Sequence, residues 1–194
     1  SGLAALMASA TDELLIVSPY FVPRERGADS LIKGAQRGVR VAVLTNSLAS
    51  NDVLAAHAGH AEHRDELIAA GVELYELRSD PAVKKRIFYL TGSSQSTLHN
   101  KVMVFDRKDV FIGSLNLDPR SGDINTEAGL YIESPDLAAQ VIAYMDEGVL
   151  PQYSYRVLLD ADGDLYWVTE TNGKIEQYDH DPNSTAWQRA KVRF

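Results

Sequence analysis

The sequence contains no cysteine, and this absence excludes disulfide bonds and thiolate chemistry. It also lacks any run of the roughly 18 to 20 apolar residues that a membrane-spanning helix requires. Its start lacks the basic-then-apolar order of a signal peptide. Basic residues are in the minority, with 19 Lys and Arg against 27 Asp and Glu and a net charge of −8. We therefore expect no nucleic-acid partner, although a local basic cleft is compatible with this balance.

The chain of 194 residues begins Ser-Gly rather than Met, and we expect one domain or one large half of a longer protein. Apolar runs typical of strands alternate with helical patterns. This alternation predicts an α/β fold in which a mixed β-sheet is flanked by helices on both faces. Strands are expected at 14–21, 39–46 and 72–78, twice within 97–118, and at 129–133; helices are expected at 28–37, 52–71 and 134–150, with a long loop over 78–96.

The pattern changes at Pro151. From there the residues alternate between apolar and polar, and the dipeptides Asp162-Gly163 and Asn172-Gly173 are typical of tight hairpin turns. We therefore expect a main unit over residues 1–150 and a β-hairpin extension over 151–194 that packs on the same domain. The run "DADGD" resembles the start of a calcium loop, but it lacks the Gly and Glu that such a loop needs at its sixth and twelfth positions.

Two polar pairs interrupt the apolar strands of the segment "TLHNKVMVFDRKDVFIGSLNLD". His99 and Lys101 are two residues apart and share one face of a strand, whereas Asp106 has the opposite parity. Ser114 and Asn116 share a face of the next strand in the same way. If the two strands are neighbours, an imidazole, an ammonium, a hydroxyl and an amide line one pocket. Removing such groups from water costs free energy, which an anionic substrate would offset.

This set of groups suits a phosphate oxyanion. The imidazole can attack phosphorus or protonate a leaving oxygen. Glu127, in the segment that leads into the last strand of the main unit, is the candidate carboxylate that binds the other imidazole nitrogen and orients the ring. The structural alternatives are a half-buried His beside a Lys whose ammonium reaches water, and a solvated Glu. The complete constellation favours catalysis.

The stretch "HNKVMVFDRKDVFIGSLN" resembles the HKD signature of the phospholipase D superfamily, which is His, any residue, Lys, four residues, Asp, six residues, Gly-Ser, any residue, Asn. Glu127 in "NTE" is similar to the acidic partner of the catalytic histidine in that superfamily. The stretches "LLIVSPYFVP", "RGVRVAVLTNSLASND", "AGVELYEL" and "GSLNLDPRSGDINTEAGL" are similar to the C-terminal half of bacterial cardiolipin synthases and their relatives. The signature positions that fit without departure are His99, Lys101, Asp106, Gly113, Ser114 and Asn116.

The resemblance implies a phospholipase D-like fold and a two-step transfer through a phosphohistidine, with no metal and no cofactor. Two HKD motifs face each other in such sites, so that one histidine attacks the phosphodiester and its counterpart protonates the departing alcohol. His99 would then be the general acid beside an N-terminal motif, or take either role in a dimer. Asp106 is expected to hold the motif backbone, and Gly113 to allow close strand approach. Only one motif is present, since no lysine stands two residues after His57, His60, His63 or His180.

Several residues are weaker candidates for substrate binding. Tyr20 and its neighbour Phe21 fit either the acyl-chain side of a cleft or the core. Asn46 and Asn51 follow the expected end of a strand, where ligand contacts are common. The histidines of "HAGHAEH" are spaced by three around a helix and indicate a polar helix face or a cleft rim. The basic run Lys84, Lys85 and Arg86 suits anionic lipid headgroups, or is simply solvated.

The leading hypothesis is phosphatidyl transfer as in cardiolipin synthase, with phospholipase D hydrolysis as the same chemistry on water. The expected partners are phospholipids and either an N-terminal HKD half of the same protein or a second copy of this chain. The resemblance also implies peripheral contact with a bacterial inner membrane. Two alternatives remain: a homodimeric single-motif phosphodiesterase or nuclease, which the acidic balance disfavours, and a non-catalytic lipid-binding half.

Overall fold

The computed structural model describes residues 2–23, 25–50, 63–80, 83, 101–113 and 129–185. They form a nine-stranded mixed sheet with the strand order β6-β5-β4-β1-β2-β3-β7-β8-β9. The strands are β1 (Glu13–Val17), β2 (Arg40–Asn46), β3 (Glu73–Leu77), β4 (Val102–Phe105), β5 (Asp109–Gly113), β6 (Gly129–Glu133), β7 (Ser154–Leu159), β8 (Leu165–Thr171) and β9 (Lys174–Tyr178). The helices are α1 (Gly2–Ala8), α2 (Glu25–Gln36), the 3₁₀ helix η1 (Leu48–Ser50), α4 (Arg64–Ala69) and α6 (Pro135–Gly148).

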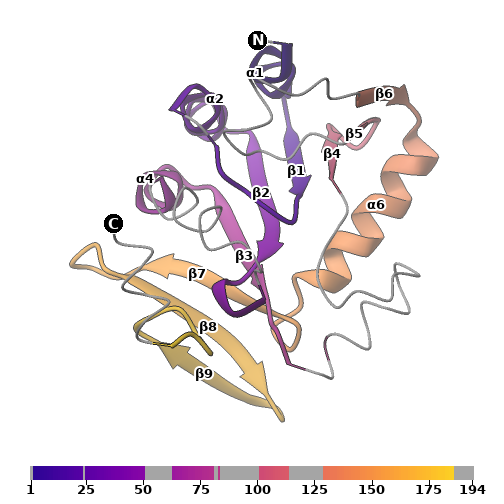
Figure 1. Cartoon of the computed structure of the whole chain (residues 1–194). Coiled ribbons are helices and arrows are strands. Elements are labelled where there is room, and N and C mark those ends of the chain that lie inside the picture. Colours follow the sequence, from indigo (N-terminus) through magenta and orange to yellow (C-terminus); the bar gives the residue numbers. More distant parts are fainter. Residues whose placement is uncertain are drawn as a thin grey trace.

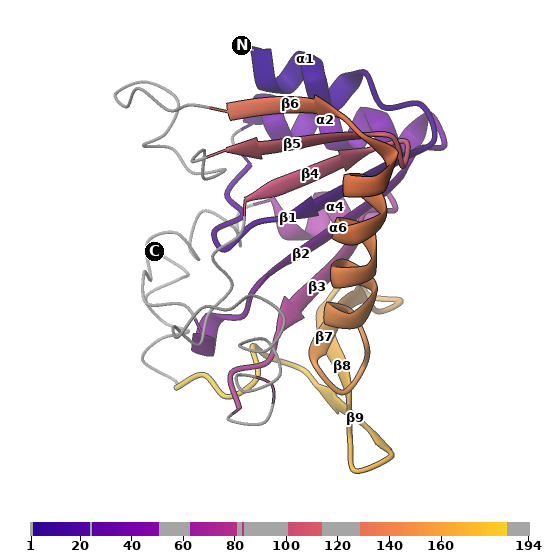
Figure 2. The ribbon, with the colours of Figure 1, turned by 90° about the vertical axis from the view of Figure 1, so that its right-hand side faces the viewer.

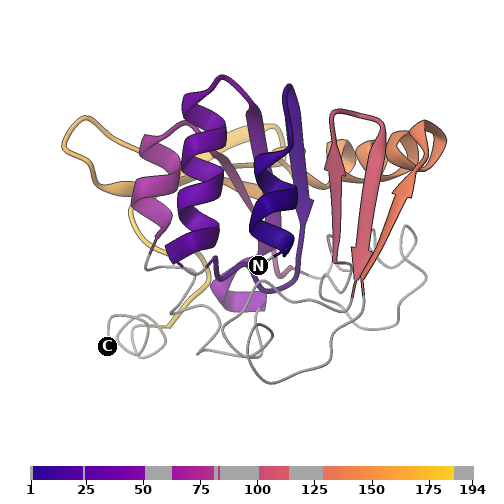
Figure 3. The same ribbon diagram turned by 90° about the horizontal axis from the view of Figure 1, so that it is seen from above.

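The centre of the sheet is parallel and its flanks are antiparallel. β2 pairs in parallel with both β1 and β3, whereas β4 joins β1 and β7 joins β3 in antiparallel register. Helices α1, α2 and α4 lie on one face of the sheet and α6 lies on the other (Figures 1 and 3). The expected α/β sheet with helices on both faces is therefore confirmed.

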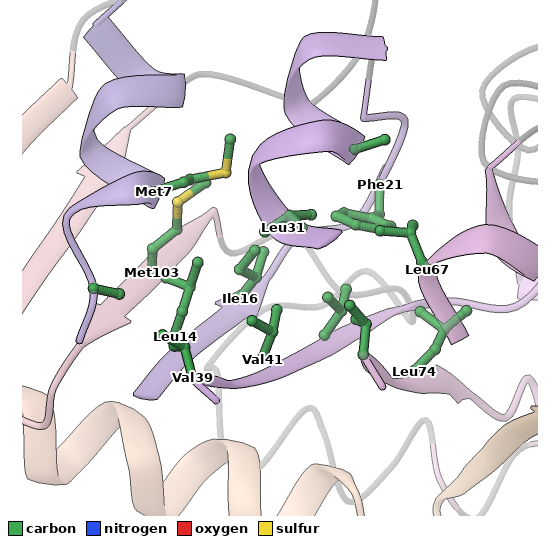
Figure 4. Packing of buried hydrophobic residues seen from close by; sticks show 14 of the residues in the cluster. Met7, Leu14, Ile16, Phe21, Leu31, Val39, Val41, Leu67, Leu74 and Met103 are labelled. Atoms are coloured by element: carbon green, nitrogen blue, oxygen red, sulfur yellow. The ribbon is translucent and has the colours of Figure 1, made fainter. Parts of the chain in front are cut away.

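Both faces of β1 are buried, as a central strand between two helical layers requires. Leu14 and Ile16 pack in one core cluster with Leu31 of α2, part of which is shown in Figure 4. Leu15 and Val17 point to the other face and pack in a second cluster with residues of α6. This packing explains why "LLIV", the part of β1 after Glu13, is an unbroken apolar run rather than an alternating one.

Helix α6 begins where the sequence predicts. Ser134 is its N-cap, and its hydroxyl accepts a hydrogen bond from the Leu137 N–H at 3.2 Å. Pro135 occupies the first helical position, where its missing N–H costs nothing. Of the helix expected at 52–71, the structure describes residues 63–71, and Arg64–Ala69 is helical there. None of the helices that the structure describes is long and apolar enough to cross a membrane.

The C-terminal strands continue the main sheet. β7 pairs with β3 in the register Leu74↔Val157, and β8 and β9 follow as a meander joined by the two predicted tight turns. Both turn glycines, Gly163 and Gly173, have positive φ angles of 87° and 76°. The division near residue 150 stays a prediction, because one continuous sheet runs through both parts.

A buried charged cluster ties these strands to the core. The Arg64 guanidinium donates from Nη1 to Glu76 at 3.0 Å and to Asp181 at 3.1 Å. Trp167 Nε1 donates to the other Glu76 oxygen at 3.0 Å, and the Arg64 guanidinium lies 5.0 Å from the Trp167 ring centroid. Burial lowers the pKa of Arg64, but the charges of Glu76 and Asp181 outweigh it and hold this pKa above its ordinary value. The cluster joins α4, β3, β8 and the segment after β9.

Replacing Glu76 with Gln is expected to lower the free energy of unfolding by about 3 kcal/mol, because a fully buried partner of Arg64 loses its charge. The measurement is urea unfolding, read as a lower midpoint at an unchanged slope. Glu66→Gln is the matched control, since its side chain is 67% exposed, and it should cost less than about 0.5 kcal/mol. Equal destabilisation by both changes would contradict a structural role for the cluster.

Candidate active site

Six strands meet at one edge of the sheet. β1, β2 and β3 run in parallel and end there, while β4 and β6 begin there and β5 ends there. Figure 2 shows this carboxyl edge on its left side, with α6 crossing the far ends of β4 and β5 on the right. Ligands of open α/β sheets bind outside the carboxyl ends of the strands. This edge is therefore the place to look for functional side chains.

Lys101 lies at the carboxyl edge. It directly precedes β4 and is half-buried. Its backbone carbonyl accepts a hydrogen bond from the Gly113 N–H at 3.2 Å. Because Val17 pairs with Val102, Ser18 and Lys101 are the next residues on the two neighbouring strands. The motif lysine thus stands beside the end of the central strand β1.

Several polar side chains at the carboxyl edge are buried. The Ser18 hydroxyl donates to the Tyr20 carbonyl at 3.0 Å, and the Thr45 hydroxyl donates to the Pro19 carbonyl at 3.4 Å. These bonds hold the turn after β1 against the end of β2. The sequence reasoning missed Ser18, Thr45 and Ser47, all of which are less than 4% exposed. The available signal for Ser18 and Thr45 was that each directly follows an apolar run, "LLIV" and "VAVL".

The weaker substrate-binding candidates lie in different places. Asn46 ends β2 at the carboxyl edge, is 3% exposed and pairs in register with Leu77. Tyr20 is half-buried in the turn after β1. Phe21, for which a cleft and a core position were both open, is a core residue and packs in the cluster that contains Leu67 (Figure 4).

Asp106 lies at the other end of β4 from Lys101. Five residues at about 3.3 Å each separate them by roughly 16 Å. The Asp106 carboxylate accepts hydrogen bonds from the backbone N–H groups of Thr11, Asp12 and Glu13 at 2.8–3.1 Å. It also accepts one from the Thr11 hydroxyl at 2.9 Å. Asp106 therefore anchors the segment that enters β1, far from the motif lysine.

These contacts shift the titration of Asp106. Partial burial raises its pKa, but the hydrogen bonds from the Glu13, Asp12 and Thr11 N–H groups outweigh it, so that the pKa lies below its ordinary value. The Asp106 backbone has a φ of 49°, in the left-handed region that Asp and Asn adopt more readily than most residues. Both the side chain and the backbone of this position thus have structural reasons for an Asp.

Two glycines face each other across the end of the β5–β6 pair. Gly113 is the register partner of Gly129. A Cβ atom on Gly129 would lie 2.2 Å from the Phe111 ring, so that no other residue fits without a shift of this ring. Gly129 thus allows β6 to lie close to β5 beside Lys101, and the role expected for Gly113 stays a prediction.

The remaining candidates lie outside the described residues, and their roles stay predictions. They include three signature positions, the acidic partner Glu127, the three basic residues of the long loop, and one of the two asparagines. Within the part of the chain that the structure describes, no group of three or more His, Asp or Glu side chains is placed to hold a metal ion. The undescribed candidates are His99, Ser114, Asn116, Glu127, Asn51, Lys84, Lys85 and Arg86.

Comparison with known proteins adds independent information. A family described as "Cardiolipin synthase, PLD-like domain" matches residues 3–148. Cardiolipin synthase C of Escherichia coli is 39% identical over 193 residues, which cover 97% of this chain and 40% of that protein. The chain thus spans well under half the length of this relative.

Solved structures share the fold. Nuc, a phospholipase D family member from Salmonella typhimurium, superposes with a TM-score of 0.58 at 18% identity, over 75% of this chain and 82% of that one. Phosphatidylserine synthase from Haemophilus influenzae also gives a TM-score of 0.58 at 18% identity, over 79% of this chain and 36% of that one. These likenesses show the fold and support the expectation of a phospholipase D-like α/β domain.

Replacing Asp106 with Asn tests the anchor. Asn keeps the left-handed backbone accessible but removes the charge of the acceptor. We expect the free energy of unfolding at pH 7 to fall by about 1 kcal/mol. This is a small value for the loss of hydrogen bonds to a charged group, because the carboxylate is partly exposed.

The pH dependence of the free energy of unfolding tests whether the charge of Asp106 is responsible for this loss. A lowered carboxyl pKa stabilises the fold above the ordinary pKa near 4, and this contribution is lost as the pH falls through the folded-state value. The gap between the wild type and Asp106→Asn should therefore be constant from about pH 8 to pH 5 and close below about pH 4. A gap that persists at low pH would show that the charge is not the cause. Chemical unfolding at each pH gives both curves.

Proposed function

The chain belongs to the cardiolipin synthase family of PLD-like domains, and we propose that it is one catalytic half of a phosphatidyltransferase. In this proposal a phosphatidyl group moves from one phospholipid to the hydroxyl of another lipid, without a metal ion or a cofactor. The observation that carries the proposal is the position of Lys101, the motif cation, beside the end of β1 at the carboxyl edge.

Two further motif positions are close in sequence to described residues. His99 precedes Lys101 by two residues, and Ser114 directly follows Gly113. Lys101 and Gly113, the described residues nearest to these two positions, both lie at the carboxyl edge. Asp106, the other described member of the motif, binds the backbone before β1. The distance between Lys101 and Asp106 supports a motif with a chemical end at the carboxyl edge and a structural end at the start of β1.

The proposed chemistry has two balanced steps. In the first, a histidine nitrogen forms a bond to phosphorus, the phosphorus–oxygen bond to the departing alcohol breaks, and the second histidine gives its proton to that oxygen. In the second, the acceptor hydroxyl loses its proton to the second histidine and attacks phosphorus, which frees the first. Lys101 and Asn116 stabilise the phosphate oxygens, and Glu127 holds the ring of His99.

This mechanism needs a second motif. His99 is the general acid if an N-terminal HKD half supplies the nucleophile, and takes either role if a second copy of this chain completes the site. The relative in Escherichia coli is long enough to hold a further half, since this chain covers 40% of it. The proposal places the assembled site at the surface of a membrane, because both substrates are lipids. Ser114, Tyr20, Asn46, Asn51 and the run 84–86 are the proposed contacts to substrate.

The test is hydrolysis of a chromogenic phosphodiester by the chain in the presence of a chelator. We expect metal-independent turnover that falls at least about a hundredfold in His99→Ala, because the variant lacks the group that accepts or donates the proton. His180→Ala is the matched control and should retain activity, since His180 is half-exposed and its ring contacts Asp179 at the surface.

The other outcomes separate the alternatives. Turnover that survives in His99→Ala removes the catalytic assignment. If neither protein turns over, the same variants are compared after a second HKD-bearing half is added, and rescue of the wild type alone supports the half-site. Lipid binding that persists without any turnover in either format indicates the non-catalytic half. Salt-dependent binding and cleavage of DNA would favour the nuclease.

A further inference from the structure

The edge strand β9 is regular and open along one side. Its five residues pair with β8 in consecutive register, from Trp167↔Tyr178 to Thr171↔Lys174, without a proline or a bulge. Within the described residues β9 pairs with no other strand, and it forms one end of the sheet (Figures 1 and 2). Natural edge strands are usually interrupted or covered, because an open edge is a template for another strand.

The turn before β9 decides which of its backbone groups point outward. Asn172 and Gly173 have φ angles of 52° and 76°, as in the two-residue hairpin turn of type I′. In such a hairpin the backbone groups of the two flanking residues face each other, and this direction alternates along the strand. The N–H and C=O groups of Ile175 and Gln177 therefore point away from β8.

The side chains of β9 give this edge a specific order. Ile175 is 78% exposed, more than any other large hydrophobic residue in the described part of the chain. Lys174 and Glu176 flank it and share the opposite face of the strand with Tyr178, which packs against the core. A cation, an apolar side chain and an anion thus follow one another along the open edge.

A second copy of β9 complements this order. A two-fold axis at Ile175 places the two Ile175 side chains opposite each other, and each Lys174 opposite Glu176 of the second copy. Opposite charges that face each other across an antiparallel pair are favourable, whereas like charges are not. An axis at Glu176 would bring two carboxylates together. An axis at Gln177 would leave Lys174 and Ile175 beyond the end of the second β9.

We propose that two copies of this chain associate by antiparallel pairing of their β9 strands, centred on Ile175, so that one sheet runs through both. A lysine on an edge strand commonly discourages such pairing, but here Glu176 of the second copy neutralises it. One strand covers less than the roughly 800 Å² per partner of a stable interface. The dimer is therefore weak and depends on protein concentration.

The inference goes beyond the proposed function and does not rest on it. β9 lies six strand spacings of about 4.8 Å from β4 in the sheet order, which is roughly 29 Å. Pairing at β9 therefore does not bring the two Lys101 residues together. It leaves both carboxyl edges open to a second HKD-bearing half.

The chain has a net charge of −8, so the positions of the other acidic groups matter. Glu170, the register partner of Ile175, would lie three strand spacings, about 14 Å, from Glu170 of the second copy. Asp164 is six residues further along, about 20 Å. Helix α6 ends over β2, where Gly148 lies against Leu44, about 19 Å from β9. Charges in physiological salt are screened over about 8 Å, so these groups oppose the pairing only weakly.

The edge strand β6 suits a second copy less well, although Leu130 is 63% exposed there. β6 and α6, which follows it, carry four acidic and no basic residues over 129–150. No basic group of this region could pair with the carboxylates of a second copy. The edge also adjoins Lys101, where the proposed function requires a second half.

Cysteine scanning of β9 tests the proposal, because the chain contains no cysteine of its own. Ile175→Cys, Glu176→Cys and Gln177→Cys are oxidised at several protein concentrations, and the cross-linked dimer is measured on non-reducing gels. Directly opposite residues have Cα atoms about 5.5 Å apart, whereas the two Glu176 positions would be about 8 Å apart and the two Gln177 positions about 14 Å. We expect at least about fivefold more dimer in Ile175→Cys, since a disulfide does not span more than about 7 Å.

Exchanging the charges tests the register. In the Ile175→Cys background, Lys174→Glu should lower the dimer yield at least about threefold, because like charges then face each other twice. Adding Glu176→Lys should restore the yield, which a misfolded variant would not do. A yield that ignores Lys174→Glu would overturn the proposed pairing.

Controls at other positions complete the experiment. Equal yields in Ile175→Cys and Gln177→Cys would show random collision and overturn the proposal, and a highest yield in Glu176→Cys would overturn the register. Leu130→Cys should give no more dimer than Gln177→Cys, and a higher yield would assign self-association to β6 instead.

The cross-linking result is separate from turnover. A cross-linked Ile175→Cys dimer should hydrolyse the chromogenic phosphodiester as the uncross-linked chain does, with or without an added half, because both carboxyl edges stay open. Loss of hydrolysis on cross-linking would contradict the pairing as placed here. Hydrolysis that survives His99→Ala would remove the proposed function and leave the β9 pairing in place.

Discussion

Burial of β1 from both sides is the constraint on which the rest of the structure depends. All five of its residues are buried, so that helices must cover both faces and strands must pair along both edges. β2 meets one edge in parallel and β4 meets the other in antiparallel register. This arrangement is what brings the end of β1, the end of β2 and the start of β4 to one place. The candidate active site exists at the carboxyl edge because the central strand is enclosed.

Charged groups complete this framework at both ends of the strands. Glu76 near the end of β3 is fully buried and holds Arg64 and Trp167, while Asp106 at the end of β4 anchors the backbone that enters β1. A buried ion pair adds little net free energy over well-packed apolar residues, but it strongly disfavours arrangements that leave one partner alone. We infer that these contacts fix which segments meet, whereas the apolar clusters supply most of the stability.

The molecule is polarised along its sheet. One end carries β4, β5 and β6 with Lys101, and the other carries the acidic strands β7, β8 and β9. The C-terminal strands nevertheless reach the core through the Arg64–Glu76 cluster and through Arg78, which donates to Thr169 and to the carbonyl of Glu170. The acidic end is therefore integral to the fold.

The sequence by itself determined the features that depend on local spacing. The period of apolar residues predicted the strands of the main unit, the Ser-Pro pair predicted the start of α6, and the resemblance carried by the motif predicted the phospholipase D-like fold. Lys101, expected within a strand, directly precedes β4 instead. Only the tertiary structure decided long-range partners: Asp106 binds residues more than 90 positions earlier, and Glu76 binds a tryptophan 91 positions later. Glu76 shares the parity of buried Leu74, and this acidic residue on an apolar face was the one local sign of a buried ion pair. Ser18 and Thr45 directly follow apolar runs, but nothing local showed that they meet at one edge. Local patterns follow from backbone geometry, whereas the choice among distant partners depends on which strands become neighbours, and this depends on the packing of the whole core.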